Sequence, residues 1–387
     1  MTTVVKTART SQSGIASSRL RVSMGDLYKL EDNEGALFVT ANTLGKEKAG
    51  NYEVKWHTLE LRPKFDALTA SAAAADGTLT VAHGNYFQVN DLIKITASKE
   101  SCMVTAVSGN TVSVTRSWGA TVAATASSTA EILIVTPHYG ENAKLQGARS
   151  VTEVQYTNNV ALWRHNLEIS GTLQAIGEQG GTFYGNDVDL QRDQMLLTHK
   201  RDINHACLFS EIGASGDQRS IMGMIEFIKT YGTNRVNSTS AFTFSVFQTA
   251  AKTATRYNNR RMVIICSRQF AQIVSEWALV TTGSHVNVEN GATMFGLEVM
   301  DIRTPHGRFR LLVDDALEGT EYSQYSVWVA TEQGKGPKWR YLRDTRILKN
   351  RQDTDQDGYE EEVLTEGTIE LGGPDFHYMT DNSDTSS

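Results

Sequence analysis

The chain has 387 residues, of which 40% are hydrophobic and 21% are charged. These fractions are usual for globular proteins and exclude wholesale disorder, while the 5 prolines exclude a proline-rich linker protein. The net charge of -7 argues against a protein that coats nucleic acid through bulk charge. At about 150 residues per domain, the length predicts two or three domains.

The cysteines and the apolar runs restrict the cellular setting. Cys102, Cys207 and Cys266 are far apart and form no CxxC pair, which argues against a disulfide framework and a cysteine-based zinc site. No apolar run approaches the ~18 residues that a membrane span needs, and no signal peptide is recognisable. We expect a soluble protein that is made in a reducing compartment, the cytosol, and is kept there or in something assembled there.

Residues 1–35 have the composition of an extended arm. The charged residues up to Gly25 are all basic: Lys6, Arg9, Arg19 and Arg21. Apolar residues are sparse, so the segment buries too little surface to offset its ordering entropy alone. We expect it either to be disordered or to lie along a partner.

Residues 36–66 are predicted to form strands. Residues 36–39 are a short apolar run, and residues 52–61 alternate in part between apolar and polar side chains. This is the pattern of a half-exposed strand or hairpin.

Residues 67–130 differ in composition and are predicted to be a small β-module inserted into that hairpin. Between its small-residue borders lie short β-type runs at residues 78–82, 92–96, 103–107 and 111–115. Ser108-Gly109-Asn110 is a hairpin turn signal between the last two runs. The chain leaves the module through another predicted strand, residues 131–135.

The strongest helix prediction covers residues 187–209, with Asn186 as N-cap and acidic residues in the first turn, where the macrodipole favours them. At about 100° per residue, apolar side chains fall on two sides of this helix. The predicted core positions are Val188, Met195, Leu196, Ile203 and Cys207. A long helix of this kind is expected to be held between two layers.

The remainder of the chain mixes helices and strands. The predicted helices are residues 221–229 and 269–278, and the predicted strands are residues 262–266, 297–302, 309–313, 325–330, 338–349 and 363–371. Residues 380–387 are a polar tail.

Catalytic motifs are absent from the sequence: there is no HExxH, GxxxxGK[ST], GxSxG or GxGxxG. The glycine-rich segment 177–185 could cradle a phosphate, but a flexible entry into the long helix is favoured. His199 and His205 are six positions apart on that helix and therefore on different faces, which does not suit a zinc site. The sequence predicts no catalytic residue and no cofactor.

Asp353, Asp355 and Asp357, followed by Gly358, alternate as the oxygen ligands of a calcium loop do. The twelfth position, however, is Leu364 where such a loop ends in glutamate. A solvated acidic turn between strands is the favoured interpretation, with the three aspartates kept as candidate metal ligands.

Residues 338–351 are basic with interleaved aromatic residues. Such a stretch could contact a nucleic-acid backbone. It could also pair with the acidic stretch that follows it, or with an acidic neighbouring subunit, and the acidic total favours these alternatives.

Several stretches resemble a known family when they are taken in order. They are the basic arm, the hairpin with Val54-Lys55-Trp56, the module containing residues 103–116, the segment Glu168–Thr172 (EISGT), the long helix and Arg219–Ile228 (RSIMGMIEFI). In this order they resemble major capsid proteins of tailed bacteriophages with the Hong Kong 97 capsid fold, in the subgroup whose extended loop carries a small β-insert. The resemblance covers most of the chain and rests on the order of elements.

The resemblance implies an α+β fold with defined regions. Residues 1–35 would be the N-terminal arm, 36–66 and 131–155 the extended loop, 67–130 the inserted β-module, 156–210 the peripheral domain with its spine helix at 187–209, 211–340 the axial domain, and 341–387 the return strands of the peripheral domain and the C-terminal tail.

It also implies a function. Such proteins form hexamers and pentamers that close into an icosahedral shell around double-stranded DNA, so we expect a virion protein assembled in the bacterial host cytoplasm. The expected partners are further copies of the chain, portal, scaffolding or decoration proteins, and DNA on the inner face. Because no long segment precedes the arm, a separate scaffolding protein, or none, is expected.

An arm with little core and a hairpin with much exposed strand would be completed by neighbouring copies. Trp56 and Leu59 are therefore expected to anchor the loop on a neighbour, and Arg19 and Arg21 to pair with acidic groups of an adjacent subunit. Two alternatives stay open: another virion structural protein, from the tail or a decoration, which would be more fully β, and a cytosolic hydrolase that uses calcium at Asp353, Asp355 and Asp357.

Overall fold

The computed structural model describes residues 35–59, 62–141, 151, 153–172, 187–237, 242–257, 259–280, 287–294, 297–319, 322 and 325–381. The chain divides into two units. The small unit is His57–Val154, and the large unit consists of Met1–Trp56 and Gln155–Ser387. The arm residues Arg19 and Arg21, the predicted N-cap Asn186 and the glycine-rich segment 177–185 lie outside the described residues.

The large unit contains a four-stranded sheet in the order β1-β19-β20-β10. Its strands are β1 (Lys46–Lys48), β19 (Lys338–Lys349), β20 (Gly358–Glu370) and β10 (Ala161–Ser170). β19 and β20 form a long antiparallel hairpin, and β10 pairs antiparallel with β20 over its whole length. Along β10 the odd-numbered residues are more buried than the even-numbered ones, because a strand turns alternate side chains to opposite faces.

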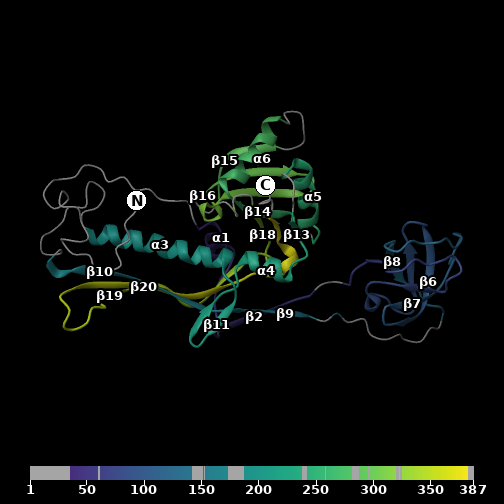
Figure 1. The fold of residues 1–387 in the computed structure, drawn as a ribbon, viewed down its shortest axis with the longest axis horizontal. Helices are drawn as coiled ribbons and strands as arrows, with labels where there is room; N and C mark the ends of the chain where they lie inside the picture. The colour runs from purple at the N-terminus through teal and green to yellow at the C-terminus, as the bar shows by residue number, and fades with distance from the viewer. Residues whose placement is uncertain are drawn as a thin grey trace. The chain divides into compact units, whose positions relative to one another are not determined.

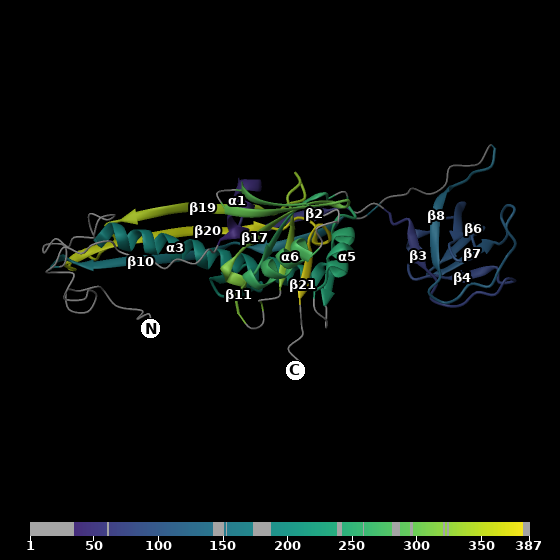
Figure 2. The same cartoon turned by 90° about the horizontal axis from the view of Figure 1, so that it is seen from above.

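Helix α3 (Asp187–Phe209) has the bounds that its hydrophobic periodicity predicts. It lies along β10 and β20 and also contacts the helices α1 (Ala36–Leu44) and α4 (Met224–Tyr231) (Figures 1 and 2). The predicted packing against two layers is therefore confirmed. One of its apolar residues departs from the prediction, because Leu197 is 41% exposed.

Residues 36–44 form helix α1, so the prediction of a strand at residues 36–39 is wrong. Four apolar residues in a row do not distinguish a strand from a buried helix turn. The buried residues Ala36, Leu37, Thr40 and Ala41 recur at helical spacing and form one face. This face belongs to the main core of the large unit rather than to an extended loop.

A seven-stranded sheet forms the second part of the large unit. Its strands, in spatial order, are β13 (Arg235–Asn237), β21 (Tyr378–Asp381), β18 (Ser326–Ala330), β14 (Arg261–Cys266), β17 (Gly307–Val313), β16 (Leu297–Thr304) and β15 (Asn287–Met294). The strands predicted at 262–266, 297–302, 309–313 and 325–330 are confirmed.

Side chains of β14 enter two different hydrophobic cores, which explains its uninterrupted apolar run. Met262, Ile264 and Cys266 pack in a core with the helices α5 (Phe244–Ala254) and α6 (Arg268–Val280), which Figure 1 shows beside the sheet. Val263 and Ile265 pack in the main core with α1, α3 and α4. The sheet therefore separates the two cores. Helix α5 was not predicted from the sequence.

Two short ribbons remain, and the boundary between the two units falls within the second of them. β11 (Gly213–Ser215) pairs with β12 (Gln218–Ser220), and β2 (Glu53–Thr58) pairs with β9 (Val154–Asn159). Single 3-10 turns occur at Asp315–Leu317 and Pro374–Phe376.

The small unit is built on a six-stranded antiparallel sheet. In spatial order its strands are β3 (Phe65–Ala67), β8 (Glu131–Pro137), β5 (Asp91–Ile95), β6 (Glu100–Ser108), β7 (Thr111–Thr115) and β4 (Thr78–Thr80), and a 3-10 turn lies at Gly84–Tyr86. The hairpin turn between β6 and β7 contains Gly109, whose φ of 57° favours glycine. β3 and β8 belong to this sheet, which therefore extends beyond the predicted module limits of 67–130.

Candidate functional site

Trp56 packs inside its own chain, so the expectation that it anchors a loop on a neighbour is wrong. Its side chain is 8% exposed and joins the main core of the large unit. The indole Nε1–H donates to the carbonyl oxygen of Gly372 at 2.8 Å, and the ring lies 6.2 Å from Tyr156 and 6.1 Å from Phe227 between centroids. A buried indole with its N–H satisfied serves the protomer core.

In the ribbon of β2 and β9, Trp56 and Asn158 are buried, and the other residues are half-buried or exposed. Asn158 is fully buried: its amide donates to Met222 and Ile369 carbonyls at 3.1 and 2.9 Å and accepts from the Met222 N–H at 2.7 Å. Within the described residues each strand has one paired edge only. Tyr52, just before β2, is 53% exposed, and Leu59, just after it, is 61% exposed.

The predicted core positions of helix α3 lie in two clusters. Met195 is buried and packs with Leu167, Ile169 and Val363 of the four-stranded sheet, and Val188 and Leu196 are partly buried against that cluster. Ile203 and Cys207 are buried in the main core.

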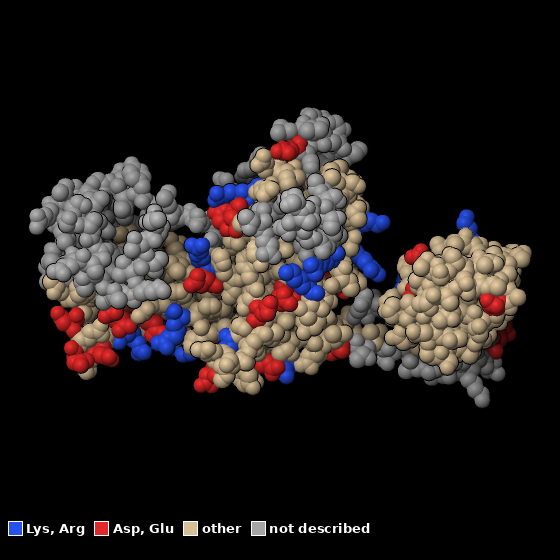
Figure 3. Space-filling view, in the orientation of Figure 1, with Lys and Arg blue, Asp and Glu red and all other residues tan. Residues whose placement is uncertain are grey.

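The basic stretch 338–351 pairs with acidic side chains of its own chain. Arg340 contacts Glu370 at 2.6 Å and also Glu47, and Arg343 contacts Glu366 at 2.5 Å. Figure 3 shows acidic and basic side chains interspersed along β10, β19 and β20. Of the alternatives for this stretch, pairing with the acidic segment that follows it is therefore confirmed.

The glutamates of β20 also receive arginines from other elements. Arg192 of α3 forms a two-pronged ion pair with Glu361, both N–O distances being 2.7 Å, and Arg164 of β10 pairs with Glu362. Although burial opposes it, the hydrogen bonds from Arg192 and Tyr359 hold the pKa of Glu361 below its usual range. The Arg164 guanidinium likewise lowers the pKa of Glu362. We call the pairs of Glu361, Glu362, Glu366 and Glu370 the Arg–Glu ladder. It joins α3, β10 and β19 to the central strand β20.

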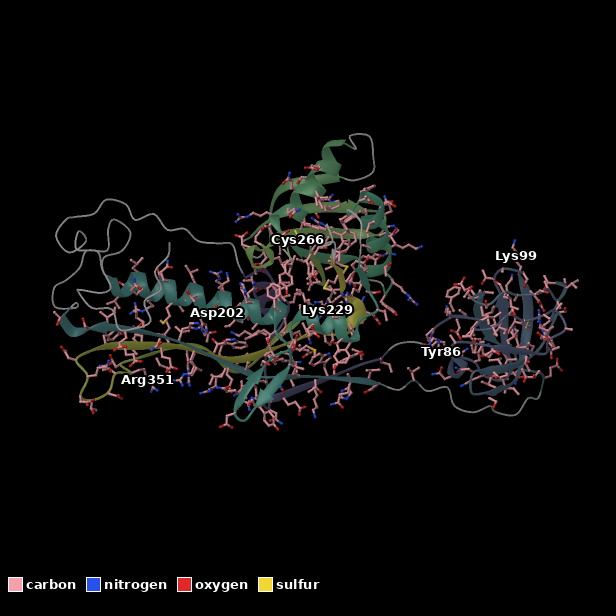
Figure 4. The ribbon with its side chains drawn as sticks, in the orientation of Figure 1. Tyr86, Lys99, Asp202, Lys229, Cys266 and Arg351 are labelled. Carbon is pink, nitrogen blue, oxygen red and sulfur yellow. The ribbon has the colours of Figure 1, made fainter. Side chains whose placement is uncertain are left out.

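The aspartates considered for calcium lie in the turn between β19 and β20. Asp353, Asp355 and Asp357 are all exposed, and Gln356 donates its N–H to the Asp353 carbonyl at 3.1 Å, which closes the turn. Arg351, at this end of the hairpin in Figure 4, lies 3.6 Å from Glu362. Over the described residues, no group of three or more His, Cys, Asp or Glu is placed to hold a metal.

The cysteines have the environment of core residues. Cys102, Cys207 and Cys266 are buried and unbonded. Burial raises the pKa of Cys102 to about 12 and raises the pKa values of Cys207 and Cys266 further. At neutral pH these groups are therefore thiols and lack the thiolate that a nucleophile needs.

No helix in the described part of the chain has the length and apolarity to cross a membrane.

The arrangement of a long helix on a β hairpin, a sheet between two cores and a separate β unit matches solved virus shells. The capsid of cyanophage P-SCSP1u has a TM-score of 0.50 at 8% identity, with 98% of each chain covered. The capsid of Myoviridae phage XM1 gives 0.50 at 8% identity, covering 95% of this chain and 98% of the other, and Mycobacterium phage Bobi gives 0.50 at 8%, covering 97% and 99%. The fold is thus that of phage capsid proteins. No curated protein sequence matches the chain.

A family model described as SU10 major capsid protein matches residues 10–383. The chain belongs to this family, and its function is that of a major capsid protein of tailed bacteriophages. The resemblance found in the sequence is therefore confirmed. The family is one of structural capsid proteins, which favours neither of the alternatives, a tail or decoration protein and a calcium-dependent hydrolase.

Proposed function

We propose that this chain assembles as hexamers and pentamers into a closed icosahedral shell around double-stranded DNA, and that assembly takes place in the host cytoplasm. Further copies of the chain are its main partners. Portal, scaffolding and decoration proteins are the other expected partners, with DNA on the inner face.

The observation that carries this proposal is the ribbon of β2 and β9. It is a two-stranded sheet whose base is held by Asn158 and Trp56, while Tyr52 and Leu59 are exposed. An isolated two-stranded ribbon is marginally stable in water, and its unpaired edges invite contact with another chain. In a shell, a neighbouring copy would cover this surface, and many small contacts would add up over the closed assembly.

Electron microscopy and sedimentation velocity of the purified full chain test the proposal directly. We expect capsomers, shells or tubes that become more abundant with concentration. A strictly monomeric species of 42.6 kDa at high concentration would contradict it.

The arm is tested by a charge-matched pair of variants. We propose that Arg19 and Arg21 pair with acidic groups of an adjacent subunit, so Arg19→Gln with Arg21→Gln should reduce the yield of closed shells. The control, Lys6→Gln with Arg9→Gln, removes the same charge from the same arm. Equal yields from both variants would remove Arg19 and Arg21 from the assembly contact. Deletion of residues 1–25 should leave the circular dichroism spectrum unchanged and impair shell closure.

Leu59 is the remaining proposed contact of the loop. Leu59→Ser removes an apolar side chain that is 61% exposed, so we expect little change in melting temperature and a lower yield of shells. Val122→Ser is the control, because Val122 is also an exposed apolar residue, at 83%, and lies outside the proposed extended loop. A normal yield with Leu59→Ser would show that this position is not an intersubunit contact.

A further inference from the structure

Five polar side chains form one continuous chain of hydrogen bonds between helix α3 and the four-stranded sheet. The Asp202 carboxylate lies 2.8 Å from His165 Nε2, and His165 Nδ1 lies 2.8 Å from His199 Nδ1. His199 Nε2 lies 2.7 Å from the Thr365 hydroxyl, which lies 2.8 Å from the Thr345 hydroxyl. We call this set the histidine chain. It begins at Asp202, labelled on α3 in Figure 4, and passes through His199 and Thr365, which are 2% and 0% exposed.

Three local features bring these side chains together. His165 occupies an odd-numbered position of β10, the set that is turned toward the buried side. His199 and Asp202 are three residues apart on α3 and therefore share a face. On β19 the pairing jumps from Arg343↔Glu366 to Arg346↔Leu364, so that Asp344 and Thr345 both oppose Thr365. A bulge of this kind redirects a side chain, and here it brings Thr345 to Thr365.

Counting hydrogens along the chain gives it a direction. Each link needs one hydrogen, and the half-exposed Asp202 carboxylate only accepts, so His165 Nε2 carries a hydrogen. If His165 is neutral, its Nδ1 accepts from a hydrogen on His199 Nδ1. His199 Nε2 must then accept from the Thr365 hydroxyl, which in turn accepts from Thr345.

A proton on His165 reverses every later link. The imidazolium of His165 donates from both nitrogens, so His199 Nδ1 must accept and the hydrogen of His199 moves to Nε2. His199 then donates to Thr365, which donates to Thr345, whose own hydroxyl hydrogen turns to solvent. Each ring nitrogen and each hydroxyl remains satisfied in both states.

We propose that the histidine chain is a one-proton switch, in which proton uptake at His165 reverses the hydrogen bonds as far as Thr345 on β19. The switch connects the exposed end at Asp202 on α3 with the outer part of the β hairpin. A second proton, on His199, would leave two nitrogen-bound hydrogens facing each other at 2.8 Å and would separate α3 from the sheet. Burial, reinforced by the neighbouring His165, lowers the pKa of His199 to about 4, so this second step requires acid.

Other charged groups near the chain are engaged in pairs of their own. On α3, Arg192 is bound to Glu361 of β20. On β20, Glu366 next to Thr365 is bound to Arg343 of β19, and on β19, Asp344 next to Thr345 is bound to Lys46 of β1 at 2.6 Å. Among the described residues, Asp202 is the carboxylate that contacts His165 directly.

Nitrogen NMR of the full-length protein labelled with 15N in its histidine rings tests the switch, recorded in the solid state so that assembly does not matter. At pH 8 we expect His199 with its hydrogen on Nδ1. As His165 titrates, the His199 hydrogen should move to Nε2 without a gain of charge. The variant His165→Gln lacks the ring signals of His165, and its spectrum therefore identifies which signals belong to His165. A hydrogen on His199 Nε2 already at pH 8 would overturn the proposal.

A remote variant sharpens this test. When His165 is protonated, the Thr365 hydroxyl donates to Thr345, and Thr345→Val removes this acceptor. When His165 is neutral, Thr365 donates to His199, and Thr345→Val leaves that hydrogen bond in place. We therefore expect the movement of the His199 hydrogen to Nε2 to require a lower pH than in the unchanged protein, by about half a pH unit or more. Thr368→Val is the control, because it removes a hydroxyl of β20 that has no hydrogen-bond partner and takes no part in the histidine chain. A shift that is absent in Thr345→Val, or equal in both variants, would also overturn the proposal.

Discussion

The carboxylate of Asp314 accepts a hydrogen bond from the backbone N–H of Ala36 at 2.8 Å, across 278 positions of sequence. The same oxygen accepts from the Asn204 amide at 3.0 Å, and the other oxygen accepts from the Ala316 N–H at 3.0 Å. Asp314 is fully buried. One carboxylate therefore joins the start of α1, helix α3 and the end of β17, and it satisfies an N–H that a helix start leaves open.

Replacing Asp314 with alanine should leave the Ala36 N–H, the Asn204 amide and the Ala316 N–H without their shared acceptor. We expect Asp314→Ala to lower the free energy of unfolding by about 2 to 4 kcal/mol, because several buried polar groups lose their partner at once. The measurement is chemical denaturation of the full chain. Asp353→Ala, an exposed turn position, is the control and should change it by less than about 0.5 kcal/mol. Similar values for the two variants would show that the helix start is held by packing alone.

In the small unit, Arg116 holds the fully buried Glu100 through two nitrogens at 2.8 and 2.7 Å. This pairing lowers the pKa of Glu100 to about 2. Arg116→Ala would leave a buried carboxylate unpaired, so we expect a loss of about 3 to 5 kcal/mol in the stability of this unit. Limited proteolysis of the full chain measures this loss of stability, as faster cleavage within residues 57–154.

The exposed Lys99→Gln is the control for Arg116→Ala, because it also removes one positive charge from this unit. Equal proteolysis rates for the two variants would contradict the assigned role of the pair. Because the pKa of Glu100 is lowered, its stabilising effect is present above about pH 4.5 and is lost as the pH falls toward 2.

His377 should make the large unit sensitive to acid. Its Nε2–H donates to the Leu371 carbonyl at 2.6 Å and its Nδ1 accepts from the Ala330 N–H at 3.3 Å, so the ring is neutral. Burial lowers the pKa of His377 to about 4. The stabilisation is therefore complete above about pH 6.5 and falls by about 2 to 3 kcal/mol as the pH drops toward 4.

Glutamine can make both hydrogen bonds of His377 without titrating. We expect His377→Gln to lose less melting temperature between pH 7 and pH 4.5 than the unchanged protein, by roughly 5 °C. The exposed His138→Gln serves as control and should follow the unchanged protein. If His377→Gln keeps the full pH dependence, the acid sensitivity has another origin.

Gly84 has no room for a side chain. A Cβ at this position would lie 1.8 Å from the carbonyl oxygen of Gly109 in the turn between β6 and β7. Because backbone atoms cannot swing away, Gly84→Ala should destabilise the small unit by about 1 to 3 kcal/mol or more. Limited proteolysis of residues 57–154 within the full chain measures this loss. Gly140→Ala is the control and should be neutral, because no atom lies within 4 Å of the added carbon. Neutral behaviour of Gly84→Ala would mean that the turn rearranges freely.

The long periodic helix α3 and the short apolar strands of the seven-stranded sheet were predictable from the sequence, whereas the helices α1 and α5 were not. Helix α3 offers 23 residues of periodicity, whereas α1 is decided by Asp314 and the main core, which are far away in sequence. Six of the 11 residues of helix α5 are Phe, Ser, Val or Thr, whose helix propensity is lower than that of alanine. In the structure its N-cap is Thr243, whose side chain accepts from the Val246 N–H.

The site shows the same limit. Trp56 was recognised as an anchor, but the sequence does not tell whether an anchor is held by its own chain or by a neighbour. From the sequence, His199 was compared only with His205 on the same helix, and that pair did not suit a zinc site. Its partner His165 stands on a strand 34 positions earlier, and only the packing of α3 on β10 brings the two rings to 2.8 Å.

The Arg–Glu ladder places a constraint on how this chain diverges over time. Each of the four glutamates of the ladder pairs with an arginine from another element, β10, α3 or β19. Substitution of either the arginine or the glutamate leaves the other charge without its partner. The two positions are therefore expected to change together. Among distant relatives, paired substitutions between β20 and these elements should therefore trace common descent where the overall identity has faded.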